Sequence, residues 1–125
     1  LMKIIISNAD PTPIYEQVVR QIQKQIIAGT LPPGYALPSI RRLAVDLQIS
    51  VITTKRAYDE LERDGFINTV GGKGSFVAEQ SQELLTEKKM REVEKILSQA
   101  VKEARSLGIK LGDMHVMLDL IYGGE

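Results

Sequence analysis

The sequence has no cysteine, no net charge and no long apolar run, and each absence removes a class of protein. Without cysteine there is neither a disulfide framework nor a thiolate metal site. The 16 basic and 16 acidic side chains balance to +0, so only local charge clusters could attract nucleic acid or membrane. No apolar run reaches the length of a membrane span and no signal-peptide pattern is visible, so we expect a cytoplasmic protein without a membrane partner.

The sequence shows no catalytic or metal-binding constellation, because its many acidic residues lie on amphipathic faces. The single histidine, His115, has no second histidine near it, which argues against a metal site. No candidate nucleophile has a base beside it, and the segment GGKG lacks the spacing and strand–loop–helix setting of a phosphate-binding loop. We therefore expect no enzyme, no cofactor and no metal.

The sequence does contain an amphipathic helical pattern near its start. Hydrophobic residues make up 43% of the 125, a globular composition that supports a modest core. Residues 11–29 carry apolar side chains at helical spacing. Thr12 is the expected cap, Pro13 suits the first helical position and Gly29 supplies a stop.

Two shorter helical patterns and a hairpin follow a loop rich in proline and glycine. Ser39 is the expected N-cap of a helix that ends near Leu47, and Ser50 that of a helix ending near Arg63. In the second of these, Thr54 begins the inward-facing set. β-prone runs at 66–70 and 75–77 flank GGKG as a hairpin tip. This order predicts a winged helix-turn-helix domain over residues 11–78.

The candidate DNA contacts are small, polar or basic residues on one side of this domain. In a helix-turn-helix the start of the second helix meets base edges, while cations and helix N-termini hold phosphates. The candidates are Ser39, Arg41, Arg42, Ser50, Val51, Ile52, Thr53, Lys55, Arg56, Gly72, Lys73 and Gly74. Singly, each has an ordinary explanation as a cap, a solvated charge or a turn residue, and only their convergence favours DNA. The acids from Asp59 onward are expected where the helix leaves the groove.

Residues 81–122 predict a helical tail. A long amphipathic helix over 81–107 is followed by the break GIKLGD and by a helix over 114–122 that is apolar on nearly every side. One chain has no further layer to cover that helix, so we expect a second copy to do so. The expected dimer interface is Val93, Ile96, Leu97, Ala100, Ala104, Leu107, Met114, Met117, Leu118 and Ile121. The predicted fold is mainly α with a small β-hairpin (α+β), a winged helix-turn-helix domain followed by a two-helix dimerisation tail.

Several motifs resemble the GntR family of winged-helix regulators. They are PIYEQ, the LPPG and LPS segments, R-x-L-A at residues 41–44, T-x-x-x-A-Y-x-x-L-x-x-x-G-F over 53–66, and GKGSFV. The short tail is similar to the YtrA-like branch, in which a helix pair joins two chains. The resemblance implies a bacterial transcription regulator, often a repressor, that binds a double-stranded, dyad-symmetric operator as a homodimer. It also implies DNA contacts from Arg41, the start of the third helix and the glycine-tipped wing.

The sequence departs from the family pattern at the start of the third helix and in the wing. Many relatives have Arg or Asn near Val51 and a basic residue near Val70 or Gly71. Contact with thymine methyl groups, or readout of DNA shape, is therefore expected at Val51. Two other functions stay open: a protein-interaction module, and the N-terminal domain of a larger aminotransferase-like regulator. A small-molecule effector would have to use the dimer interface or the groove between domain and tail.

Overall fold

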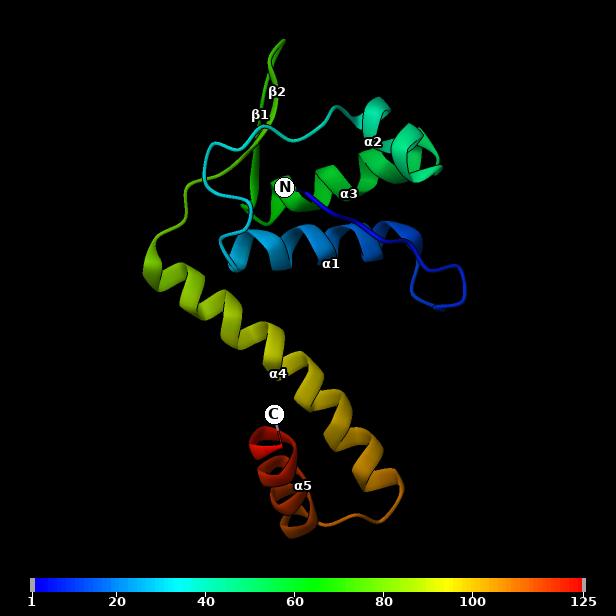
Figure 1. Cartoon of the computed structure of the whole chain (residues 1–125), viewed down its shortest axis with the longest axis vertical. Coiled ribbons are helices and arrows are strands. Elements are labelled where there is room, and N and C mark those ends of the chain that lie inside the picture. Colours follow the sequence, from blue (N-terminus) through cyan, green and yellow to red (C-terminus); the bar gives the residue numbers. More distant parts are fainter. Residues whose placement is uncertain (1, 125) are drawn as a thin grey trace. The chain divides into compact units, whose positions relative to one another are not determined.

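The computed structural model describes residues 2–124, apart from the side chain of Gln82. The chain forms two compact units, the first ending at Leu85 and the second beginning at Thr86, within the first turns of one helix. The elements, labelled in Figure 1, are α1 Ile14–Ile27, α2 Ile40–Leu47, α3 Val51–Arg63, β1 Ile67–Val70, β2 Gly74–Val77, α4 Gln82–Ser106 and α5 Leu111–Gly123. This is the element order that the sequence predicts.

Helix α1 begins one residue later than the sequence predicts. Pro13 occupies the N-cap position with extended backbone, and no side chain caps the helix. The predicted cap by Thr12 is wrong, because Pro13 takes the N-cap position; the Thr12 N–H donates instead to the Asp10 carboxylate at 2.8 Å. That bond lowers the pKa of Asp10. The inward stripe is as predicted, with Val18, Val19 and the isoleucines of the next turns buried.

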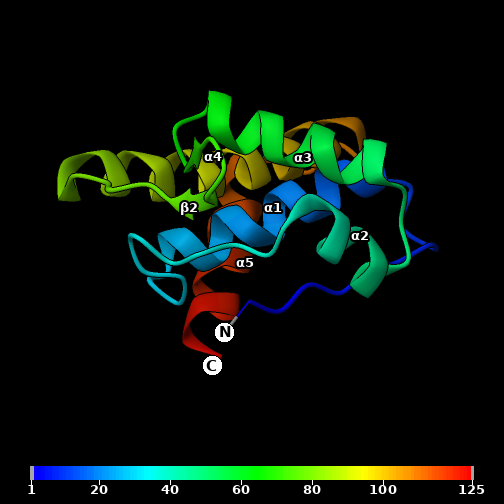
Figure 2. The same cartoon turned by 90° about the horizontal axis from the view of Figure 1, so that it is seen from above.

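The core of the first unit lies where α1 and α2 both pack on α3 (Figure 2). Its largest fully buried side chains are Ile22, Leu31, Leu61, Ile67, Val18 and Thr54. Thr54 is buried as its helical spacing predicts, and its hydroxyl is satisfied by the Ser50 carbonyl at 3.0 Å. Gln48 ends α2 in the left-handed conformation, with φ of 56°, which turns the chain into α3.

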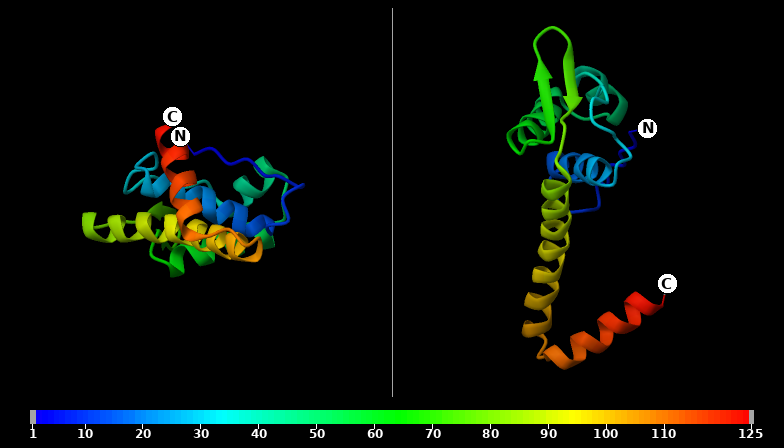
Figure 3. Two further views of the ribbon diagram at one scale, coloured as in Figure 1. Left: turned by 90° about the horizontal axis from the view of Figure 1, so that it is seen from below. Right: turned by 90° about the vertical axis from the view of Figure 1, so that its left-hand side faces the viewer.

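The hairpin β1–β2 forms the wing and projects away from the helices (Figure 3). It is antiparallel, with Ile67 opposite Val77 and Val70 opposite Gly74. The loop before α2 adds a partial third strand, because the Leu37 N–H donates to the Ser75 carbonyl at 2.9 Å. The wing is therefore anchored at its base to the segment that leads into α2.

An extended arm, residues 2–7, is tied to α1 by three glutamine side chains. Each amide accepts a bond from a backbone N–H of the arm and donates one to the carbonyl of the same residue. The pairs are Gln25 with Lys3 (3.1 and 2.7 Å), Gln21 with Ile5 (2.8 and 2.7 Å) and Gln17 with Ser7 (2.9 and 3.0 Å). We call this set the glutamine ladder. The glutamine ladder was not predicted from the sequence.

The second unit consists of most of α4 and of α5, which diverge from the turn that joins them (Figure 3). The turn is closed by the Ile109 N–H, which donates to the Ala104 carbonyl at 2.8 Å. The predicted break, which included Gly112 and Asp113, is too long, because α5 already begins at Leu111. Both residues are accommodated in its first turn, where helical hydrogen bonds are not yet required of the N–H groups.

Candidate nucleic-acid interface

The N-terminus of α2 is fixed from both sides. The Ser39 hydroxyl accepts a bond from the Arg42 N–H at 3.1 Å, as expected of an N-cap. One residue earlier, the Pro38 carbonyl accepts a bond from the Tyr58 hydroxyl of α3 at 2.7 Å. Burial raises the pKa of Tyr58 well above its usual range, so the phenol remains a donor. The two helices are thus locked together beside the cap.

The first turn of α3 bonds its own hydroxyl groups. The Ser50 oxygen accepts from the Thr53 N–H at 3.0 Å, and the Ser50 hydroxyl donates to the Thr53 hydroxyl at 2.8 Å. Thr54 points inward, as predicted. Among the predicted contacts of this turn, only Val51 and Ile52 have exposed side chains without a partner. The predicted base-reading turn is therefore mostly apolar on its outside.

Two predicted phosphate contacts are paired with acids on their own helix. The Arg42 guanidinium lies 3.2 Å from Asp46, and the Lys55 ammonium lies 2.8 Å from Asp59. All four side chains are largely exposed, so each pair is weak and can be exchanged for a phosphate at small cost.

Arg56 is held by α1. Its guanidinium stacks over the Tyr15 ring at 3.8 Å from the centroid and donates to the Tyr15 hydroxyl at 3.1 Å. Such a cation–π contact is worth about 0.5–1 kcal/mol at an exposed site. Arg56 therefore links α3 to α1 as well as carrying charge, a role that the sequence analysis did not assign to it.

Arg41 and Lys73 are the uncommitted cations of the predicted set. Within residues 2–124, neither side chain has a hydrogen bond or an ion pair. Arg41 lies in the first turn of α2, beside the Ser39 cap, and Lys73 lies at the tip of the wing. Gly72 and Gly74 flank Lys73 with φ of 78° and 115°, conformations that side-chain-bearing residues rarely adopt.

The acids of α3 are occupied by local partners. Glu60 and Asp64 lie 3.8 and 3.9 Å from Arg63, and Glu62 accepts a bond from the Thr69 N–H of the wing at 3.2 Å. These residues occupy the C-terminal half of the helix. That this half of the helix points away from DNA stays a prediction.

The predicted dimer residues are mostly exposed in the single chain. Ala104 is buried and Met114 is half-buried, but the other eight are in contact with water: Val93, Ile96, Leu97, Ala100, Leu107, Met117, Leu118 and Ile121. Helix α5 buries none of its described residues. The tail alone therefore leaves a large amount of apolar surface in water.

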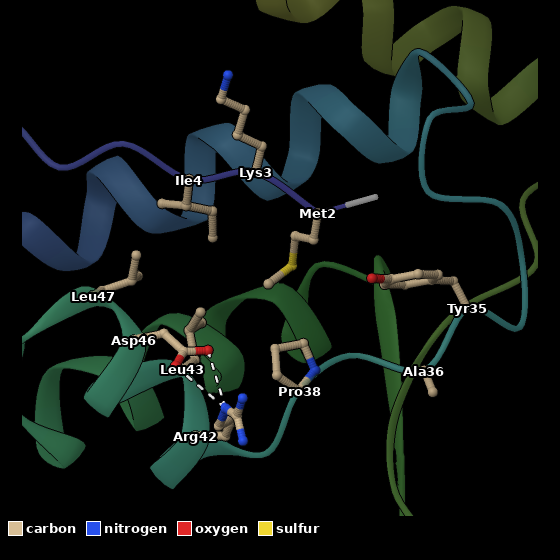
Figure 4. Close-up of a pocket in the computed structure, with 10 residues that line it drawn as sticks. All are labelled: Met2, Lys3, Ile4, Tyr35, Ala36, Pro38, Arg42, Leu43, Asp46 and Leu47. Atoms are coloured by element: carbon tan, nitrogen blue, oxygen red, sulfur yellow. Dashed lines mark hydrogen bonds and ion pairs between the residues drawn. The ribbon is translucent and has the colours of Figure 1, made fainter.

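A cavity of about 590 Å³ lies between the arm and α2 (Figure 4). Met2 and Ile4 point from the arm into it, whereas Lys3 points away, and the Arg42–Asp46 pair lies along its wall. Neither this cavity nor the arm was predicted from the sequence. The glutamines that hold the arm are four residues apart in the sequence, a spacing that places them on one face of a helix.

Two further findings concern the described residues. Among residues 2–124, no group of three or more acidic or histidine side chains is placed to hold a metal ion. None of the helices in that range is long and apolar enough to cross a membrane.

Comparisons with known proteins place this geometry in context. The sequence profile described as "Bacterial regulatory proteins, gntR family" matches residues 14–77. The chain is 37% identical to the HTH-type transcriptional repressor YtrA of Bacillus subtilis (strain 168) over 112 residues, which are 90% of this chain and 86% of that protein. A GntR family transcriptional regulator from Listeria monocytogenes has a similar structure, with 31% identity, a TM-score of 0.76 and coverage of 88% of this chain and 96% of that one. The AraR DNA-binding domain in complex with operator ORX1 is 26% identical, with a TM-score of 0.54 over 62% of this chain and 96% of that chain.

Proposed function

Because this chain belongs to the gntR family of bacterial regulatory proteins, we propose that it represses transcription by binding a dyad-symmetric operator as a homodimer. DNA-binding transcriptional regulation is the function of the family. Repression is supported by the similarity to YtrA, which is named a repressor, and operator binding by the similarity to the operator-bound AraR domain. For this chain the supporting observation is that uncommitted Arg41 lies in the first turn of α2, beside the capped N-terminus that Tyr58 of α3 holds through the Pro38 carbonyl.

The proposed contacts with DNA divide between phosphates and bases. Arg41 and Lys73 neutralise phosphates, because neither side chain has a competing partner within residues 2–124, and the N-terminus of α2 adds its partial positive charge. Lys55 and Arg42 join them by exchanging a carboxylate for a phosphate. The first turn of α3 enters the major groove, and the glycine-flanked wing tip approaches the backbone or the minor groove.

The proposed dimer is formed by the tail. The exposed apolar side chains of α4 and α5 would each gain about 1.5–3 kcal/mol on full burial. Two copies joined in this way carry two winged helix-turn-helix domains. The two domains could then occupy half-sites about one helical turn of DNA, or a multiple of it, apart. Linking the two contacts raises the affinity for a two-half-site operator over that for one half-site.

DNA binding by the proposed face is tested with Arg41→Ala and the matched control Lys24→Ala. Lys24 is an exposed cation of α1, outside the helix-turn-helix. We expect Arg41→Ala to weaken binding to the promoter of the protein's own gene cluster about tenfold, as loss of a charge-assisted bond implies. The slope of log affinity against log salt should fall by about one. Equal, small effects of both substitutions in mobility-shift titrations would place the DNA face elsewhere.

A further inference from the structure

The outward surface of the first turn of α3 is built from methyl groups. Ile52 is 82% exposed and Val51 is 47% exposed. An isolated exposed aliphatic side chain is ordinary in a protein, but two adjacent ones at the start of a reading helix leave the reading position without polar side chains. What the turn can recognise is therefore decided by the hydrogen-bonding capacity left around these two residues.

Part of that capacity is used inside the turn. The Ser50 hydroxyl donates to the Thr53 oxygen and accepts from the Thr53 N–H, so Ser50 is engaged, whereas the Thr53 hydroxyl keeps its own proton. Thr54 is buried and donates to the Ser50 carbonyl. Bidentate reading of guanine or adenine uses Arg, Lys, Asn or Gln, and residues 50–54 include none of these.

The apolar pair also shares a helix face with a cation. Lys55 lies four residues after Val51 and three after Ile52, so the side chains are neighbours on the helix surface. A methyl patch next to an ammonium group complements a groove whose wall is phosphate and whose floor carries an apolar group. Among the bases, the major groove offers such a group as the C5 methyl of thymine.

We propose that Val51 and Ile52 determine the specificity of this regulator by contacting the C5 methyl groups of pyrimidines in the major groove. The inference rests on the proposed function, because it requires α3 to enter that groove. 5-Methylcytosine presents the same methyl group, so methylation of a cytosine at these positions should create a contact. Each methyl buried against the pair should contribute about fourfold in affinity.

The test uses the full chain and a duplex that the protein selects from a randomised pool. Each thymine of the selected half-site is replaced singly by deoxyuridine, which removes only the methyl group, and dissociation constants are measured by fluorescence anisotropy. We expect binding to weaken about threefold to fivefold at one or two positions. Replacing the same T·A pair by C·G should weaken binding further, and 5-methylcytosine there should recover part of the loss.

Ile52→Ala should lower the preference for thymine over uracil at the position that Ile52 contacts. The exposed position of Ile52 makes the variant fold normally, and Ile5→Ala, which changes another exposed isoleucine, in the arm, should keep the preference. A selected duplex bound equally well with uracil at every position would overturn the inference and leave the proposed function intact. Failure to enrich or bind any duplex, at low salt as well as high, would overturn both.

Discussion

Tyr58 helps to position the two helices of the helix-turn-helix, α2 and α3. Its ring is buried against the core while its hydroxyl bonds the Pro38 carbonyl at 2.7 Å. Pro38 directly precedes Ser39, so the bond sets where α2 begins relative to α3. Without it, the half-buried carbonyl would lose its protein partner, at a cost of about 1 kcal/mol.

The raised pKa of Tyr58 predicts a loss of stability in alkali. An unfolded chain releases the phenolic proton near pH 10, whereas the folded chain still holds it, so the free energy of unfolding falls as pH rises above about 10. Tyr58→Phe, which has no such proton, should show a shallower decline. Chemical denaturation between pH 8 and pH 11 measures both slopes.

At the residue scale, the sequence predicts local partners and misses distant ones. The caps at Ser39 and Ser50 and the inward turn of Thr54 depend on spacings of three or four residues, and the structure confirms them. The pairing of Arg56 with Tyr15 spans 41 residues. It depends on how α1 packs across α3, which no single-helix pattern contains.

At the scale of elements, the glutamine ladder forms because the rise of four helical residues nearly matches the rise of two extended residues. Four residues of α-helix rise about 6.0 Å, and two residues of extended chain rise about 6.6 Å. Glutamines at positions 17, 21 and 25 therefore stay in register with every second residue of the arm. The arm gave no helical or hairpin pattern in the sequence, because the partners of its ladder bonds are side chains of another element.

Gln21→Glu should release the arm from α1. The carboxylate cannot donate to the Ile5 carbonyl, and it places a negative charge 2.7 Å from that oxygen. Gln23→Glu makes the same change on α1 outside the ladder and is the control. We expect faster cleavage of the arm in limited proteolysis for Gln21→Glu alone. Equal cleavage of the two variants would show that apolar packing of Met2, Ile4 and Ile6 holds the arm.

The helices themselves could be predicted from periodicity, with errors at their ends. The long break expected before α5 was wrong because Gly112 and Asp113 read as helix breakers, although the first turn of a helix tolerates both. The assignment of residues 11–78 to DNA binding and of 81–122 to dimerisation stays a prediction. The two compact units meet at Leu85 and Thr86, close to that boundary but inside α4.

At the scale of the whole molecule, the exposed tail predicts an association that a charge should break. Ile121 is 69% exposed on α5, and Ile121→Asp would place two charges in the proposed dimer interface. Sedimentation velocity should show at least about a hundredfold weaker dimer, from the apolar burial lost in both copies. Operator affinity should fall with it.

Ile5→Asp is the matched control for the tail. Ile5 is 66% exposed but belongs to the first unit, so the same charge there should leave the sedimentation coefficient unchanged. A monomeric wild-type chain at micromolar concentration, or an Ile121→Asp variant that sediments as the wild type does, would contradict a tail-mediated dimer.

The glutamine ladder also has a kinetic consequence. It protects only one edge of the arm, because the amides of Lys3, Ile5 and Ser7 donate to glutamine oxygens while those of Ile4 and Ile6 face the other way. Hydrogen–deuterium exchange followed by NMR should therefore alternate along this segment, slow at odd positions and fast at even ones. The bonds involve no ionised side chain, so this alternation of exchange rates should persist at salt concentrations that dissociate the protein from DNA.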